Sequence, residues 1–175
     1  MLKIIAIIAG VVIAAILILA ATKPDTFRVQ RTLSIKAPPE KIFGLVNDFH
    51  SWALWSPYEK KDLAMKKTYS GNAVGSGAKY AWQGDKNVGT GSMEITSSVE
   101  PSKIIIAFDF LEPFAAHNTA EFSFEAQGDS TVVTWATQGP SPYLTKIMHL
   151  FFNMDKMVGD DFEVGLANLK TLAEK

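Results

Sequence analysis

The chain opens with a long run of apolar residues that has no polar face. From Ile4 to Ala21, none of the 18 residues carries a polar side chain. At a rise of about 1.5 Å per residue, a helix of this length spans about 27 Å, close to the hydrocarbon thickness of a bilayer. A core helix of a soluble protein would show a polar stripe. The pattern therefore predicts a single uncleaved membrane anchor over residues 1–21.

A cleaved signal peptide and a buried helix are the alternatives for this segment. A signal peptide has a shorter apolar region and a cleavage site of the small-x-small type, and Leu19 occupies a position that would need a small residue. Only Lys3 and the α-amine precede the run, whereas four basic residues follow it, which favours a cytoplasmic location for the rest of the chain. They are Lys23, Arg28, Arg31 and Lys36. A folded domain can cross the membrane despite so small a difference in the number of basic residues. The sequence therefore leaves open on which side of the membrane the domain lies.

A short polar linker, residues 22–26, leads into a region of alternating apolar and polar positions. Residues 27–36 alternate with a period of two and predict a half-buried strand, in which Arg31 is an exception on the apolar register. Six further runs of the same period lie between residues 65 and 139, each bounded by turn-forming residues. Such closely spaced runs predict consecutive antiparallel strands, a meander.

Helical periodicity appears at two places in the same region. Residues 38–55 predict two short helices, the second of which places Trp52 and Trp55 on one face, at least one of them in the core. Near the C-terminus, a helical segment over residues 143–152 precedes a long amphipathic helix. The apolar stripe of that helix consists of Val158, Phe162, Leu166, Leu169 and Leu172. Because one face of the sheet must be covered, this helix is expected to cover it.

Composition narrows the classes of function. The net charge of −1 gives no basic face, so we expect no nucleic-acid partner. The absence of Cys excludes disulfides, Cys-containing zinc sites and a Cys nucleophile. Aromatic residues make up 11% of the chain, which implies either a dense core or an aromatic pocket.

The order of these elements and several segments resemble the START-like helix-grip superfamily, often called SRPBCC, and in particular its polyketide cyclase/dehydrase branch. The resemblance covers residues 27–175. The segments that carry it are "SIKAPPEKIFGLVNDFHSWALWSP", "GTGSMEI", "VEPSKIIIAFDF", "STVVTW" and "FEVGLANLKTLAE". It implies an α+β, birch-pollen-allergen-like fold: a curved seven-stranded antiparallel sheet wrapped on a long C-terminal helix. The N-terminal transmembrane helix is an addition to that domain. Proteins of this type bind hydrophobic or amphipathic molecules between sheet and helix, and they share a cavity and not a catalytic motif.

The inward positions of the predicted strands are mostly apolar and aromatic, with few polar atoms. This composition is typical of a pocket for a hydrophobic ligand that carries one small polar group. A filled core is the alternative, because aromatic residues on an inward face usually only pack. The predicted ligand-binding residues are Trp55, Tyr80, Trp82, Met93, Phe108, Phe110, Asn118, Phe122, Trp135, Met148 and Phe152.

An enzyme would need an acid or base that reaches this pocket. The candidates are Tyr80, His117 and His50, although His117 falls on the outward register and no His shows a partner at short spacing. Neither an HExxH motif nor an EF-hand loop occurs, and the Gly pairs GSG and GTG lie between strands as turns or bulges. We therefore expect no metal and no cofactor.

Three functions fit this reading. The first is a membrane-anchored domain that binds or transports a small hydrophobic molecule or lipid. The second is a cyclase- or dehydratase-type enzyme that uses the same cavity. The third is a stress- or chaperone-type domain whose groove contacts a protein, and the sequence names no such partner.

Overall fold

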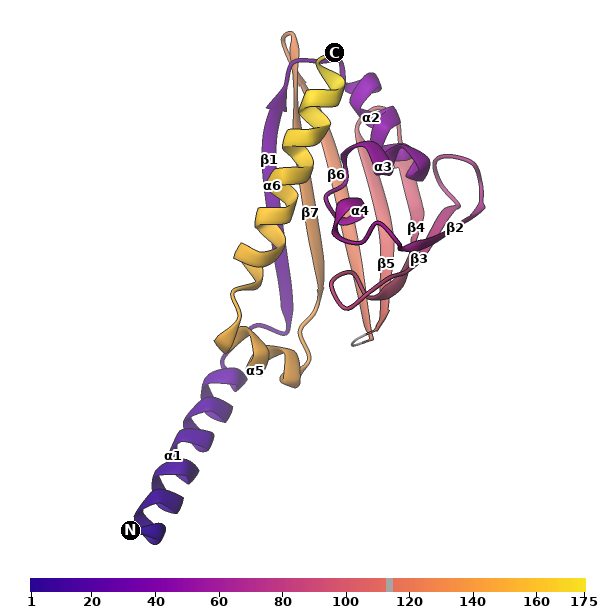
Figure 1. The fold of residues 1–175 in the computed structure, drawn as a ribbon. Coiled ribbons are helices and arrows are strands. Elements are labelled where there is room, and N and C mark those ends of the chain that lie inside the picture. Colours follow the sequence, from indigo (N-terminus) through magenta and orange to yellow (C-terminus); the bar gives the residue numbers. More distant parts are fainter. Residues whose placement is uncertain (113–114) are drawn as a thin grey trace.

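Seven strands form one antiparallel sheet in the computed structural model, which describes residues 1–112 and 115–175 (Figure 1). The strands are β1 (Thr26–Ile35), β2 (Lys66–Gly71), β3 (Ala78–Gln83), β4 (Thr90–Val99), β5 (Lys103–Glu112), β6 (Ala116–Gln127) and β7 (Ser130–Pro140). Their order in the sheet is β1-β7-β6-β5-β4-β3-β2, so β2 to β7 form the predicted meander and β1 returns to pair with β7.

Register shifts in the β4–β5 pair lie between Thr90 and Gly91 and between Ile95 and Ser97. Such irregularities bend a strand and increase its twist. Gly91 is needed at the first shift, because a Cβ there would collide with the carbonyl oxygen of Asp109 and with the ring of Trp82. The sheet is therefore curved.

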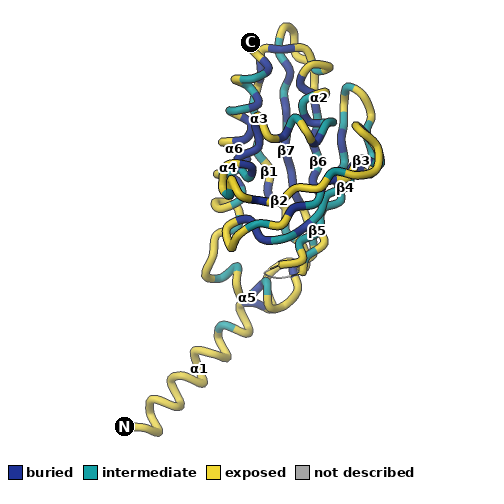
Figure 2. Tube along the Cα trace, turned by 45° about the vertical axis from the view of Figure 1, so that its right-hand side comes forward, coloured by how far each residue is buried: buried dark blue, intermediate teal, exposed yellow. Residues whose placement is uncertain are grey.

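Helix α6 (Met154–Ala173) runs along the concave side of the sheet and is preceded by α5 (Tyr143–Phe151). Asn153 caps α6 by accepting a hydrogen bond from the backbone N–H of Lys156 at 2.9 Å. The rings of Phe162 on α6 and Trp135 on β7 stack with centroids 3.9 Å apart. Buried residues concentrate on the strands and on the sheet-facing side of α6 (Figure 2). This arrangement confirms the predicted α+β helix-grip architecture.

Arg31, the exception in the alternating pattern of β1, lies against α6. Its guanidinium donates to Glu163 at 2.7 Å and to both oxygens of Asp155 at 3.1 Å. These hydrogen bonds raise the pKa of Arg31 above its already high value and lower that of Asp155. Arg31 therefore joins the edge strand to the covering helix, and a charge is tolerated on the inward register because it is paired.

A chain segment between β1 and β2 closes one side of the domain. It forms α2 (Pro39–Asn47), a 3-10 turn over Phe49–Ser51, α3 (Trp52–Trp55) and α4 (Tyr58–Lys61). The indole N–H groups of Trp52 and Trp55 donate to the carbonyl oxygens of Val46 and Leu45, at 2.9 and 3.1 Å. Both tryptophans are buried, so they fix this segment to the sheet.

Helix α1 (Leu2–Ala21) extends away from the domain and is exposed along almost its whole length (Figure 2). By length and composition it is able to cross a membrane, and the same properties fit a signal sequence. Its last turns lie beside α5, where the hydroxyl of Tyr143 donates to the carbonyl oxygen of Leu17 at 2.6 Å.

Candidate functional site

A cavity of about 530 Å³ lies between the sheet, α6 and the α3–α4 segment. Its walls come from the inner face of β3 to β7, from Phe27 on β1, from one side of α6 and from the short helices that close the domain. Three of its lining residues, Lys61, Asn87 and Met157, are exposed to solvent. The mouth of the cavity therefore lies between α4, the β3–β4 turn and the first part of α6.

Most of the predicted wall residues line this cavity. They are Tyr80, Trp82, Met93, Phe108, Phe110, Asn118 and Trp135. The structure places Trp55 and Phe122 in the core, each with no exposed surface. Met148 lies on the exposed side of α5, and Phe152 lines a second hollow, described below. The cavity thus gathers the strand residues, and a role for any of them in binding stays a prediction.

A buried carboxylate forms the polar corner of the cavity. Glu59 on α4 is 8% exposed and accepts a hydrogen bond from the Tyr80 hydroxyl at 2.7 Å. Its other oxygen pairs with the ammonium of Lys67 on β2. Burial, together with the Glu59 hydrogen bond and charge, raises the pKa of Tyr80. Tyr80 therefore stays protonated at neutral pH, and the corner presents a paired charge instead of a bare anion.

Sequence reasoning missed Glu59. The predicted short helix ends at Trp55, and the structure confirms that end, but Pro57 then precedes a further helical turn that carries Glu59 inward. A proline at the start of a helix is a recognisable signal, because its missing N–H is not needed there. That signal identifies α4, whereas the inward direction of Glu59 depends on how α4 packs on the sheet.

A second polar group holds the mouth together. Lys61 on α4 pairs with Asp161 on α6 at 2.5 Å, and the Lys61 ammonium lies 5.0 Å from the centre of the Tyr58 ring. Burial and the neighbouring Asp161 charge raise the pKa of Tyr58. The Lys61–Asp161 pair joins α4 to α6 across the rim of the cavity.

Two of the three acid/base candidates lie away from the cavity. His117 is on the outer face, with its side chain 82% exposed and its Nδ1 2.7 Å from Asp109. His50 stacks on Tyr69, and its Nδ1 lies 3.0 Å from Asp48. The expectation that no His has a partner at short spacing was therefore wrong for His50, whose partner caps the same 3-10 turn. Tyr80 is the candidate that lines the cavity.

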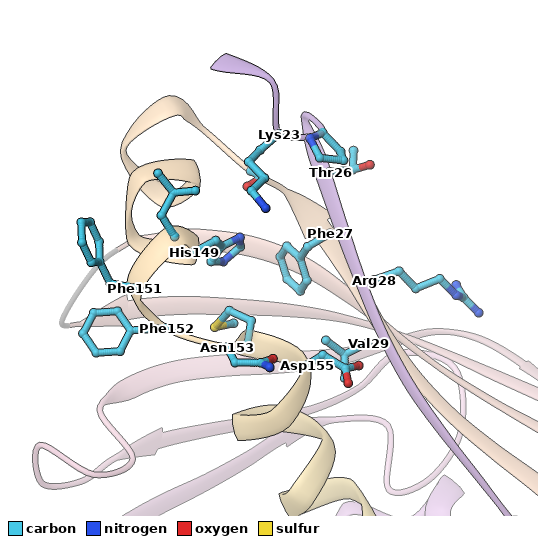
Figure 3. Close-up of a pocket in the computed structure, with 14 residues that line it drawn as sticks. Lys23, Thr26, Phe27, Arg28, Val29, His149, Phe151, Phe152, Asn153 and Asp155 are labelled. Atoms are coloured by element: carbon cyan, nitrogen blue, oxygen red, sulfur yellow. The ribbon is translucent and has the colours of Figure 1, made fainter. Parts of the chain in front are cut away.

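A second hollow of about 460 Å³ lies between β1 and the region where α5 meets α6 (Figure 3). The rings of Phe27 and His149 point toward each other there, with centroids 6.2 Å apart. Burial and the charge of Lys23 lower the pKa of His149. Phe27 and Met154 line both this hollow and the main cavity, so the two spaces share a wall.

Metal ligands do not gather in the part of the chain that the structure describes, where no group of three or more His, Asp or Glu side chains is placed to hold an ion. Among the polar groups of the cavity, Glu59 and Tyr80 are hydrogen-bonded to each other, whereas the buried indole N–H of Trp135 has no partner among the described residues.

Comparison with known sequences identifies a family over nearly all of the domain. Residues 26–174 match the family described as polyketide cyclase / dehydrase and lipid transport. Among curated proteins, none matches the sequence.

Solved structures share the fold at low sequence identity. Protein CV1439 from Chromobacterium violaceum is 15% identical with a TM-score of 0.59, over 87% of this chain and 99% of that one. The Aha1 dimer from Colwellia psychrerythraea is 17% identical with a TM-score of 0.58, over 85% of this chain and 96% of that one. The di-domain ARO/CYC BexL from the BE-7585A biosynthetic pathway is 14% identical with a TM-score of 0.62, over 90% of this chain and 53% of that one. At these identities, the similarity establishes the fold alone.

Proposed function

Because the chain belongs to the polyketide cyclase / dehydrase and lipid transport family, we propose that its cavity binds a small hydrophobic molecule or lipid. The observation that carries this proposal is an aromatic cavity of about 530 Å³ with one polar corner, formed by Glu59, Tyr80 and Lys67. Ligand pockets are typically apolar, with a few placed polar groups that orient the ligand. The oxygens of Glu59 and Tyr80 supply such groups, since they can accept a hydrogen bond from a hydroxyl on an otherwise apolar molecule.

Membrane attachment through α1 completes the proposal. With 20 residues, α1 is about 30 Å long, enough to cross the hydrocarbon core. In this scheme residues 1–21 are the anchor, residues 22–26 the linker and residues 27–175 the binding domain, with the basic residues after α1 favouring the cytoplasmic side. A short linker keeps the cavity at high effective concentration beside ligands dissolved in the bilayer.

Native mass spectrometry of the full chain, purified in mild detergent, tests the binding function. We expect an added mass of lipid size on the parent protein. Ala120→Leu should remove it, because Ala120 is a buried wall residue and the larger side chain fills the cavity. Ala167→Leu, on the exposed side of α6, is the matched control and should keep the added mass.

A dansyl-labelled fatty acid serves as the defined probe in the same preparation. Energy transfer from the cavity tryptophans should appear with the parent and the Ala167→Leu control, and should weaken with Ala120→Leu. A parent protein that carries no added mass and does not bind the labelled fatty acid contradicts the proposal.

A cyclase- or dehydratase-type enzyme is the second candidate, because Tyr80 and Glu59 are titratable groups in the cavity wall. General acid or base catalysis contributes about 10²–10⁴ in rate, so Tyr80→Phe should lower turnover in a polyketide cyclisation assay by that factor. His117→Ala, on the outer face, is the control and should leave turnover unchanged. Equal turnover by both variants would remove Tyr80 from the mechanism.

A further inference from the structure

Helix α5 has its apolar residues on the outside and its charged residue on the inside. Leu144 and Phe151 are 63% and 65% exposed, and Met148 lies between them on the same face. Lys146 on the opposite face is only 7% exposed and pairs with Asp25 at 2.6 Å. A helix that faces water has the reverse arrangement, with its apolar side covered.

Contacts with α1 and with the chain that follows it fix the position of this helix. The Tyr143 hydroxyl contacts the carbonyl oxygen of Leu17, which is four residues before the end of α1. At about 1.5 Å per residue, this contact lies about 6 Å inside the end of α1. The Lys146–Asp25 pair joins α5 to the linker, just beyond that end. The exposed face of α5 therefore continues the apolar surface of the last turns of α1.

Aromatic residues are also placed as they are at a membrane surface. Tyr143 is 45% exposed, and Phe151 and Phe152 are exposed at the other end of α5. Tyr side chains are enriched at the boundary between lipid and water, where a ring and a hydroxyl are both accommodated. An apolar patch of this kind on a soluble monomer marks an interaction surface.

We infer that α5 is an interfacial membrane helix, which lies in the headgroup region of a phospholipid bilayer with Leu144, Met148 and Phe151 turned toward the acyl chains. This inference rests on the proposed anchoring by α1. An amphipathic helix in this position buries its apolar face about 5–10 Å into the boundary between headgroups and acyl chains. It holds the domain against the bilayer and places the hollow between α5 and β1 at the lipid surface (Figure 3).

Site-directed spin labelling tests this inference on the full chain, which contains no Cys and so accepts one label at a time. Leu144→Cys and Phe151→Cys report on α5, and Val12→Cys reports on the middle of α1. Val164→Cys is the matched control, since Val164 is an exposed apolar residue on α6. Each labelled protein is reconstituted into vesicles of phosphatidylcholine and phosphatidylglycerol, and collisions with oxygen and with a water-soluble nickel chelate give the label depth.

We expect the α5 labels at a depth of about 5–10 Å, the Val12 label deeper and the Val164 label in water. The inference is overturned if the α5 labels are as accessible to the nickel chelate as the Val164 label while the Val12 label lies in lipid. That outcome leaves the proposed anchor intact. Labels on α5 that are shielded from both probes also overturn it, because they show that protein covers this face. A Val12 label in water overturns the anchor and this inference together, whereas ligand binding by the cavity is measured separately.

Discussion

At the scale of single residues, the polar corner of the cavity shows how a buried charge is made tolerable. Glu59 has little contact with water, and its two oxygens are bonded to Tyr80 and Lys67. A buried carboxylate without such partners would carry a large desolvation penalty. Each partner is therefore part of the structure of the corner, whether or not a ligand occupies the cavity.

Replacing Tyr80 with Phe tests this account. The change removes the donor to Glu59 and should lower the free energy of unfolding by about 1–3 kcal/mol, because the buried carboxylate loses a hydrogen bond. Urea denaturation followed by tryptophan fluorescence measures the loss. Tyr69→Phe is the matched control on the neighbouring strand and should stay within about 0.5 kcal/mol of the parent. Equal effects at both positions would contradict the account.

His149 provides a prediction for pH. Burial and Lys23 hold its pKa below the ordinary value of 6.5, so the folded protein takes up this proton less readily than the unfolded chain. The contribution of His149 to stability is therefore present above about pH 6.5 and is lost as the pH falls through the lowered pKa.

Unfolding midpoints measured from pH 8 to pH 5 test the role of His149. His149→Gln should make the unfolding midpoint fall less steeply below about pH 6.5. Thr145→Gln on the same helix is the control, and its midpoint should fall with pH as steeply as that of the parent. A slope in His149→Gln equal to that of the parent would assign the pH dependence to other groups.

At the scale of elements, the close approach of α6 to the sheet depends on Gly165. A Cβ at this position would lie 2.7 Å from Cζ3 of Trp135 and 3.1 Å from Cδ of Pro57. Gly165→Ala should therefore destabilise the fold by about 1–3 kcal/mol through overpacking. Outside its own helix backbone, no described residue has an atom within 4 Å of a Cβ added to Gly44 on α2, and Gly44→Ala should stabilise the fold by about 0.5–1 kcal/mol. Thermal unfolding of both variants checks the opposite signs, and a stabilising Gly165→Ala would show that α6 is not tightly packed there.

The elements were largely predictable from the sequence, whereas the boundary between cavity and core was not. Alternation with a period of two identifies the inward residues, and Phe122 and Trp135 are both inward and are partners across β6 and β7. Only Trp135 lines the cavity, while Phe122 is packed by Trp52 and Trp55. Which inward residue meets empty space depends on where the short helices and α6 lie. That is a property of tertiary packing, and no local pattern encodes it.

At the scale of the whole molecule, the proposed anchor makes a prediction for fractionation. A charge at the centre of a membrane helix costs about 2.5–3.5 kcal/mol, so Val12→Arg should shift the protein from the membrane pellet toward the alkaline-soluble fraction. Val12→Leu is the control and should stay in the pellet. A parent protein that is fully extracted at alkaline pH would contradict anchoring, and an active C-terminal alkaline phosphatase fusion would contradict the cytoplasmic side.

The pairing of β1 with β7 also sets an order of events during synthesis. β1 is the first strand made, and in the described sheet it pairs with β7, the last strand, so that Phe27 lies opposite Gly139 across more than 100 residues. At about 5–20 residues per second, β1 waits about 5–20 s on the ribosome before β7 exists. A lone strand is a hazard for wrong pairing, and charged side chains reduce that hazard. Arg28 and Arg31, on opposite faces of β1, supply that protection during the wait, before Arg31 acquires its partners on α6.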